Sequence, residues 1–128
     1  MSYYFAKTVA TSFDEAIARA TAALKQEGFG VISDINVMAT MQAKLNVDFR
    51  PYRILGACNP TLAYEALKLE DKVGTMLPCN VVVQELAPGR VEVAAIDPVA
   101  SMTAIGNPKL KEKAEAVRAK LKRVIAAL

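Results

Sequence analysis

Residues 80–96 read NVVVQELAPGRVEVAAI, and this stretch decides the fold class of the chain. Two runs rich in β-branched residues, Asn80 to Leu86 and Val91 to Ile96, flank the turn-forming pair Pro88-Gly89. β-Branched residues favour strands, and a short Gly-containing connection between two such runs is typical of an antiparallel hairpin. We therefore predict two neighbouring antiparallel strands here, the second of which stops at Asp97-Pro98.

Three further strands are predicted upstream of this hairpin. They are expected from Tyr3 to Thr8, from Val31 to Ile35 and from Tyr52 to Ala57, where aromatic or β-branched residues favour a strand.

The clearest helix start is the capping box formed by Ser12 and Glu15, in which each side chain can satisfy a backbone amide at the helix start. The helix is predicted to end at Gly28, because glycine readily adopts the left-handed conformation of a helix C-terminus. Apolar residues recur at helical spacing between the two, at Phe13, Ile17, Ala20 and Leu24.

Three more helices are expected at Asn caps. Asn36 caps a short helix, Asn59 with Pro60 starts a helix running to about Lys68, and Gly106-Asn107-Pro108 introduces the last one. Residues 99–107, just before the last helix, are predicted to be a loop. The expected apolar faces are Met38, Met41 and Leu45 in the first, Leu62, Ala63, Ala66 and Leu67 in the second, and Leu110, Ala114, Val117, Leu121, Val124 and Leu128 in the last.

The predicted order is β-α-β-α-β-α-β-β-α, with a polar connection over residues 70–75. Helices inserted irregularly among five strands indicate an α+β fold rather than a doubly wound sheet. A length of 128 residues without repeat or linker predicts a single domain over 1–128.

Composition excludes several classes of protein. The chain is 53% hydrophobic and 23% charged, which is typical of a globular protein and not of a disordered one. No apolar run is long enough to span a membrane, so we expect no membrane partner. The first residues, MSYYFAK, lack the pattern of a signal peptide, and we expect a cytoplasmic location.

The net charge of +3 is unevenly distributed: residues 109–123 contain seven basic and two acidic residues, a net +5, and the rest of the chain sums to −2. We interpret this segment as the solvated face of the last helix and expect no nucleic-acid partner, because no aromatic residues are interleaved with the charges. Histidine is absent, so a Ser-His-Asp or Cys-His arrangement cannot form within one chain.

The residues best suited to chemistry are Cys58 and Cys79, each followed by an asparagine, Asn59 and Asn80. Cys58 directly precedes a predicted helix start, where free amides would stabilise a thiolate. The alternative is that both cysteines are small buried apolar residues. A reversible disulfide stays open if the sulfurs meet, and so does a soft ion such as copper(I) with help from Met76 or Met102.

Neither a metal nor a cofactor is predicted as a resident group. Two thiolates without histidine leave the usual zinc shell incomplete. Asp97 is a further candidate, because a carboxyl at the end of an apolar strand can face a cleft. An Asp before Pro more often starts a turn, and we favour that interpretation.

The phrases ILGACNP (54–60) and LPCNVVV (77–83), followed by IDP (96–98) and Met102, resemble the domain-of-unknown-function 302 family. The resemblance covers nearly the whole chain. It implies a curved, mainly antiparallel sheet of about five strands packed on a long C-terminal helix, similar in layout to the TATA-binding-protein-like fold. It also implies a homodimer, and shared polar positions at Cys58, Asn59, Cys79, Asn80, Asp97 and Pro98. No activity follows from it.

Three functions from different classes remain. The preferred one is a ligand-binding or sensing domain whose ligand is a small anion, a sulfur species or a soft metal. It has a thiol site at the two Cys-Asn pairs, and the ligand-binding candidates are Cys58, Asn59, Cys79, Asn80 and Asp97. The next is a structural or dimerisation protein without small-molecule chemistry. The last is a thiol-dependent enzyme, in which Cys58 would be the nucleophile, Cys79 the resolving thiol and Asn59 or Asn80 an oxyanion donor. The catalytic residues of such an enzyme stay unknown.

Overall fold

Five antiparallel strands form one open sheet in the order β1-β5-β4-β3-β2 in the computed structural model, which describes residues 2–128. The fold is α+β, as predicted, and the hairpin of β4 and β5 pairs Val83 with Val93. The strands are β1 (Tyr4–Val9), β2 (Gly30–Asn36), β3 (Tyr52–Cys58), β4 (Cys79–Ala87) and β5 (Arg90–Ile96).

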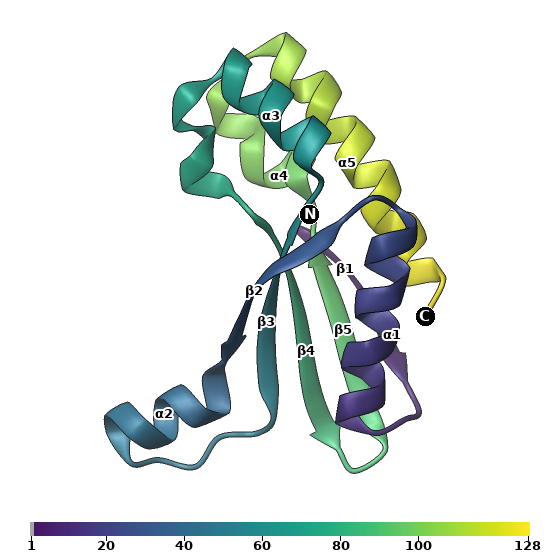
Figure 1. Ribbon diagram of the computed structural model, residues 1–128. Coiled ribbons are helices and arrows are strands. Elements are labelled where there is room, and N and C mark those ends of the chain that lie inside the picture. Colours follow the sequence, from purple (N-terminus) through teal and green to yellow (C-terminus); the bar gives the residue numbers. More distant parts are fainter. Residues whose placement is uncertain (1) are drawn as a thin grey trace.

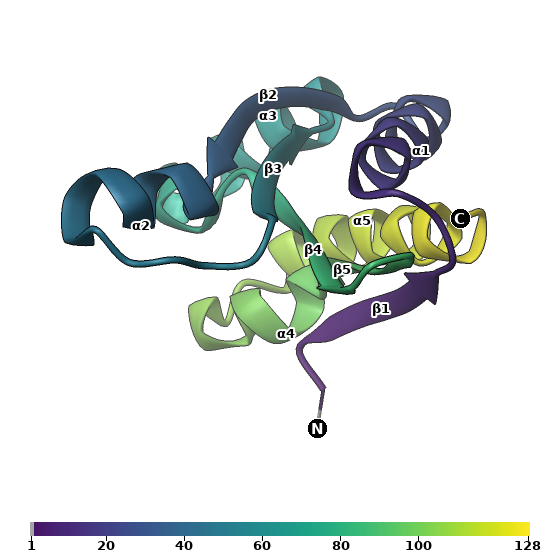
Figure 2. The same cartoon turned by 90° about the horizontal axis from the view of Figure 1, so that it is seen from below.

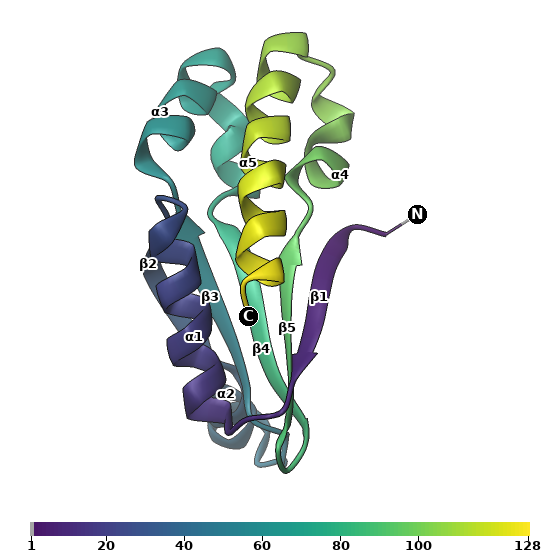
Figure 3. The ribbon, with the colours of Figure 1, turned by 90° about the vertical axis from the view of Figure 1, so that its right-hand side faces the viewer.

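The helices are distributed over one face and both ends of this sheet. Helices α1 and α5 lie side by side on one face, whereas α3 and α4 gather at one end of the strands (Figures 1 and 3). Helix α2 projects at the opposite end, away from α5 (Figure 2). The bounds are α1 (Phe13–Gln26), α2 (Val37–Leu45), α3 (Pro60–Leu69), α4 (Pro98–Met102) and α5 (Pro108–Ala126), with 3-10 segments η1 (Asp71–Met76) and η2 (Thr103–Ile105).

The main core lies between the sheet and helices α1 and α5. Side chains alternate between the two faces of a strand, so every second residue of β4 and β5 points toward these helices. The inward-pointing residues are fully buried: Val81, Val83, Val91, Val93 and Ala95. Leu121, from the apolar stripe predicted for α5, is fully buried against them. The apolar pattern of the sequence therefore places this core correctly.

Helix α1 begins and ends as predicted. The Ser12 hydroxyl accepts a hydrogen bond from the Glu15 amide at 3.2 Å, and Gly28 has a φ of +85°. The reciprocal half of the capping box does not form, because the Glu15 carboxylate accepts a hydrogen bond from Arg19 Nε instead.

The prediction of a loop over residues 99–107 is wrong. Helix α4 and η2 occupy most of that segment. Helix α4 starts because the Asp97 carboxylate accepts a hydrogen bond from the Val99 amide at 3.0 Å, and because Pro98 suits the first helical position. Residues 70–75, predicted to be a polar connection, mostly form η1.

Helix α2 forms at its predicted Asn36 cap, yet none of its residues is buried. Its predicted apolar face is largely exposed, with Leu45 at 65%. The apolar spacing thus predicts the helix but not a packing partner for it in one copy of the chain.

Candidate functional site

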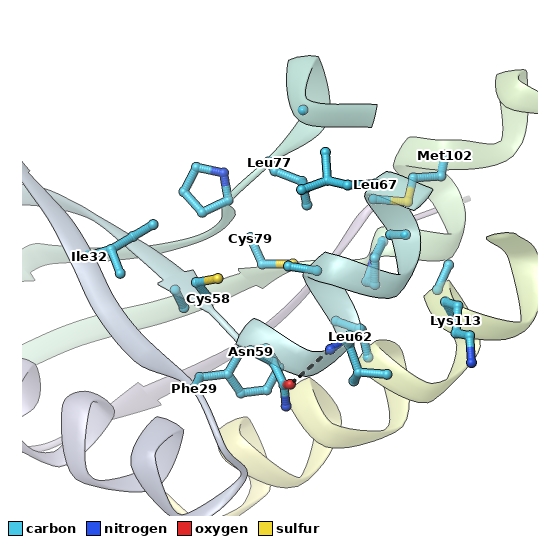
Figure 4. Close-up of a pocket in the computed structure, with 18 residues that line it drawn as sticks. Phe29, Ile32, Cys58, Asn59, Leu62, Leu67, Leu77, Cys79, Met102 and Lys113 are labelled. Atoms are coloured by element: carbon cyan, nitrogen blue, oxygen red, sulfur yellow. Dashed lines mark hydrogen bonds between the residues drawn. The ribbon is translucent and has the colours of Figure 1, made fainter. Parts of the chain in front are cut away.

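An apolar cavity of about 300 Å³ lies where α3 and α4 meet the end of the sheet. Figure 4 shows the two cysteines at one end of this space and Met102 at the other. The walls come from the starts and ends of strands and from three helices: Phe29, Ile32, Ala57, Cys58, Asn59, Leu62, Ala63, Ala66, Leu67, Gly74, Leu77, Pro78, Cys79, Pro98, Met102, Lys113, Ala114 and Val117.

Small side chains create this space. Helices α3 and α5 face each other through Ala63, Ala66 and Ala114, and the strand side contributes Ala57. Alanine lets two backbones approach while filling little volume between them. The neighbouring larger residues, Leu62 and Leu67, stay partly exposed instead of closing the gap.

Cys58 and Asn59 reach the cavity because β3 ends where α3 begins. The Asn59 side chain accepts a hydrogen bond from the Leu62 amide at 3.3 Å (Figure 4), and Pro60 occupies the first helical position. The cap therefore takes one of the free amides that could have stabilised a Cys58 thiolate.

The turn after α1 presses against the same asparagine. A Cβ on Gly28 would lie 3.0 Å from Asn59 Nδ2, and the φ of +85° at Gly28 already disfavours other residues. Gly28 therefore leaves the room that the Asn59 side chain occupies at the start of α3.

Cys79 opens β4 directly beside this junction, and its side chain is only 8% exposed. Burial raises the pKa of the Cys79 thiol to about 11, and the charge of Cys58 adds to the increase. Cys79 is therefore a neutral thiol near pH 7, and it contributes a soft, apolar surface to the cavity. Both cysteines are free.

Lys113 is the one charged residue that lines the cavity. Its ammonium group pairs with the Glu65 carboxylate at 2.8 Å, which joins α5 to α3. This hydrogen bond and the opposite charge lower the pKa of Glu65 and raise the pKa of Lys113. Figure 4 shows the ammonium directed away from the thiols, so the cavity interior stays apolar.

The structure brings together three of the five predicted ligand-binding residues, Cys58, Asn59 and Cys79. Asn80 lies elsewhere, because its side chain points to the sheet face opposite α1 and α5, alongside Val82 and Tyr52. Successive residues of a strand face opposite sides, so the second Cys-Asn pair cannot present both side chains to one site.

Asp97 also lies outside the cavity wall, although Pro98 is part of it. The Asp97 carboxylate caps α4 and lies 3.4 Å from Arg118 Nε of α5. The Asp97 side chain is buried at this junction of β5, α4 and α5, and it starts a helix rather than the turn expected for Asp-Pro.

Sequence reasoning missed most of the cavity wall. Leu62, Ala63 and Ala66 were assigned to a buried stripe, and Ala114 and Val117 to another. The alanines of these two helices are visible in the sequence, but the sequence does not show that α3 and α5 lie next to each other with a cavity beside those alanines.

Within residues 2–128, no helix is both long and apolar enough to cross a membrane. The same residues contain no group of three or more Cys, Asp or Glu side chains arranged to hold a metal ion.

A five-stranded antiparallel sheet with two helices on one face and an apolar cavity at its end defines a small α+β domain. The profile of the family described as "Domain of unknown function DUF302" matches residues 5–128. The chain belongs to this family.

A solved structure supports the assignment. The chain is similar to an uncharacterized conserved DUF302 protein from Bacillus stearothermophilus, with 32% sequence identity and a TM-score of 0.90. The alignment covers 99% of this chain and 98% of that one. No curated protein matches the sequence.

Proposed function

We propose that the protein binds a small, mainly apolar molecule in the cavity between α3, α5 and the end of the sheet. The observation that supports the proposal is the cavity of about 300 Å³, whose wall is made almost entirely of carbon and sulfur atoms. Small-molecule sites typically start at this volume and combine apolar walls with few polar groups.

The wall favours an uncharged ligand over a small anion. A buried anion needs several hydrogen-bond donors, because removing its charge from water is costly without them. The wall offers few donors: the Lys113 ammonium already pairs with Glu65, and Asn59 is the remaining side chain of the wall with N–H groups. The protonated Cys79 thiol adds polarisable surface without charge.

A saturable fluorescence titration with N-phenyl-1-naphthylamine, an uncharged aromatic probe, tests this proposal. We expect one probe per chain in reduced wild-type protein. Ala114→Leu fills the space between α3 and α5 and should abolish binding, whereas Ala22→Leu on the exposed side of α1 is the matched control and should bind normally. Equal binding by both variants, or none by wild type, would contradict the proposal.

A second candidate function, a structural homodimer, is favoured by the uncovered face of the sheet. This face carries Tyr3, Tyr4 and Tyr52 around Val82 and Ala94, and Tyr3 is 64% exposed. Such exposed apolar surface is suited to a second copy of the chain. Sedimentation velocity of wild type and Ala94→Lys tests it: a monomeric wild type would count against the dimer.

The thiol-enzyme alternative has the weakest support. The chain has no histidine to serve as a base for a Cys58 nucleophile, and the amide of Leu62 at the start of α3 is already bound by the Asn59 cap. Two free thiols suit a reducing compartment, and we propose the cytoplasm as the location.

A further inference from the structure

The two cysteines occupy neighbouring positions in the sheet as well as in the cavity wall. The ladder between β3 and β4 pairs Ala57 with Cys79, and Cys58 is the next residue after Ala57. Strand spacing and rise place the Cys58 and Cys79 Cα atoms about 6 Å apart, within the range that a disulfide spans.

Both sulfur atoms are also directed into one space. Consecutive residues of a regular strand face opposite sides, but Cys58 is the last residue of β3, where the chain turns into α3. Cys58 and Cys79 both line the cavity, and Figure 4 shows their side chains toward the same end of it.

The two thiols differ in access. Cys58 is partly exposed at the edge of the cavity, whereas Cys79 is buried behind it. An oxidant from solution therefore meets Cys58 first, and Cys79 is held where a product on Cys58 would be within reach. The sequence contains no third cysteine that could compete.

We propose that Cys58 and Cys79 are a reversible redox pair, in which a hydroperoxide oxidises Cys58 and Cys79 then closes an intramolecular disulfide across the end of the cavity. This inference goes beyond ligand binding and does not depend on it. Cytosolic disulfides are typically of this transient, redox-sensing kind.

The first step is the attack of the Cys58 thiolate on one oxygen of the hydroperoxide. A sulfur–oxygen bond forms, the oxygen–oxygen bond breaks, and the leaving alkoxide or hydroxide takes a proton from water. The sulfur loses two electrons to the peroxide and becomes a sulfenic acid.

In the second step, the Cys79 sulfur attacks Cys58 Sγ. The disulfide bond forms, the sulfur–oxygen bond breaks, and the departing hydroxide combines with the Cys79 proton to give water. A dithiol reverses the reaction by exchange at the accessible Cys58 sulfur.

The test treats reduced, full-length protein without ligand with hydrogen peroxide or cumene hydroperoxide, then alkylates it with iodoacetamide under denaturing conditions. Intact-mass and peptide mass spectrometry should show a monomer lighter by two hydrogens, unalkylated, with Cys58 joined to Cys79. Dithiothreitol should restore two alkylatable thiols. Disulfides between chains, or stepwise oxidation of Cys58 to sulfinic acid without closure, would overturn the proposal.

Single variants assign the roles. Cys79→Ser and Cys79→Ala should both stop at a Cys58 sulfenic acid that dimedone traps, and two substitutions guard against a folding defect in either one. Cys58→Ser should leave Cys79 unmodified under the same treatment. Faster dimedone labelling of Cys79 than of Cys58 would overturn the assignment. Because the experiment involves no ligand, a negative probe titration with normal disulfide closure would reject only the ligand-binding proposal.

Discussion

Helix α5 runs through two regions that are packed in opposite ways. Its C-terminal half lies in the dense core over the sheet, where Leu24, Leu121 and Val124 are all completely buried. Its N-terminal half borders the cavity, and the buried cluster there consists of only Ala66, Val73 and Leu110. One helix thus joins a filled region to an unfilled one.

The two regions differ in how completely side chains fill the space around α5. Protein interiors are normally packed as tightly as organic crystals, and the apolar space of about 300 Å³ interrupts that packing between α3, α5 and the end of the sheet. We expect the dense region to contribute most of the free energy of unfolding. Substitutions that line the cavity should lower that free energy less, because they remove fewer buried contacts. The free thiols lie on the cavity side of this division.

The largest effect that separates the two regions is expected from truncating leucines. Leu121→Ala should lower the free energy of unfolding by about 2–5 kcal/mol, because it deletes fully buried atoms and leaves a new void. Leu62→Ala should cost about 1 kcal/mol, since Leu62 is half-buried beside an existing space. Urea unfolding measures both; equal losses would show that the regions are packed alike.

A smaller effect should come from Cys79 at alkaline pH. Its pKa rises from an ordinary 9.0 to about 11 on folding, so the unfolded chain loses its proton first. The unfolded state binds fewer protons than the folded state between these values, and stability therefore falls as pH rises. The loss should reach about 1.4 kcal/mol by pH 10.

The matched measurement compares wild type with Cys79→Ala from pH 8 to pH 10 under a phosphine reductant. Other titrating groups affect both proteins, so the difference between their slopes isolates the Cys79 thiol. Wild type should lose stability more steeply. Parallel slopes would mean that the Cys79 thiolate is as well solvated in the folded protein as in the unfolded chain.

Much of the fold could be predicted because its signals are local. The hairpin followed from two β-branched runs around Pro88-Gly89, and the cap residues Asn59 and Asn107 followed from the prolines after them. The missed helix α4 uses the same device at Asp97-Pro98. Its five residues are too few to show a periodic apolar pattern, so the start signal was interpreted as a stop.

The candidate site could be predicted only in part, because it depends on contacts between distant segments. The repeated Cys-Asn phrase indicated two equivalent pairs, yet Asn59 caps a helix beside the cavity and Asn80 lies on the opposite face of the sheet. The local phrase is the same, but one pair ends a strand and the other begins one. Strand alternation and the crossing of α3 and α5 decide the difference.

The smallest effect concerns the cap that holds α3 over the cavity. Asn59→Ala removes the acceptor for the Leu62 amide and should cost about 1 kcal/mol. Helix α3 buries only Ala66 completely, so the loss should appear mainly as faster amide hydrogen exchange within α3, while Leu121 and its neighbours stay protected. Asn59→Asp keeps the acceptor and should retain most of the protection. If exchange rose equally in the C-terminal half of α5, the cavity region and the dense core would open as one cooperative unit, and the contrast between them would not extend to their dynamics.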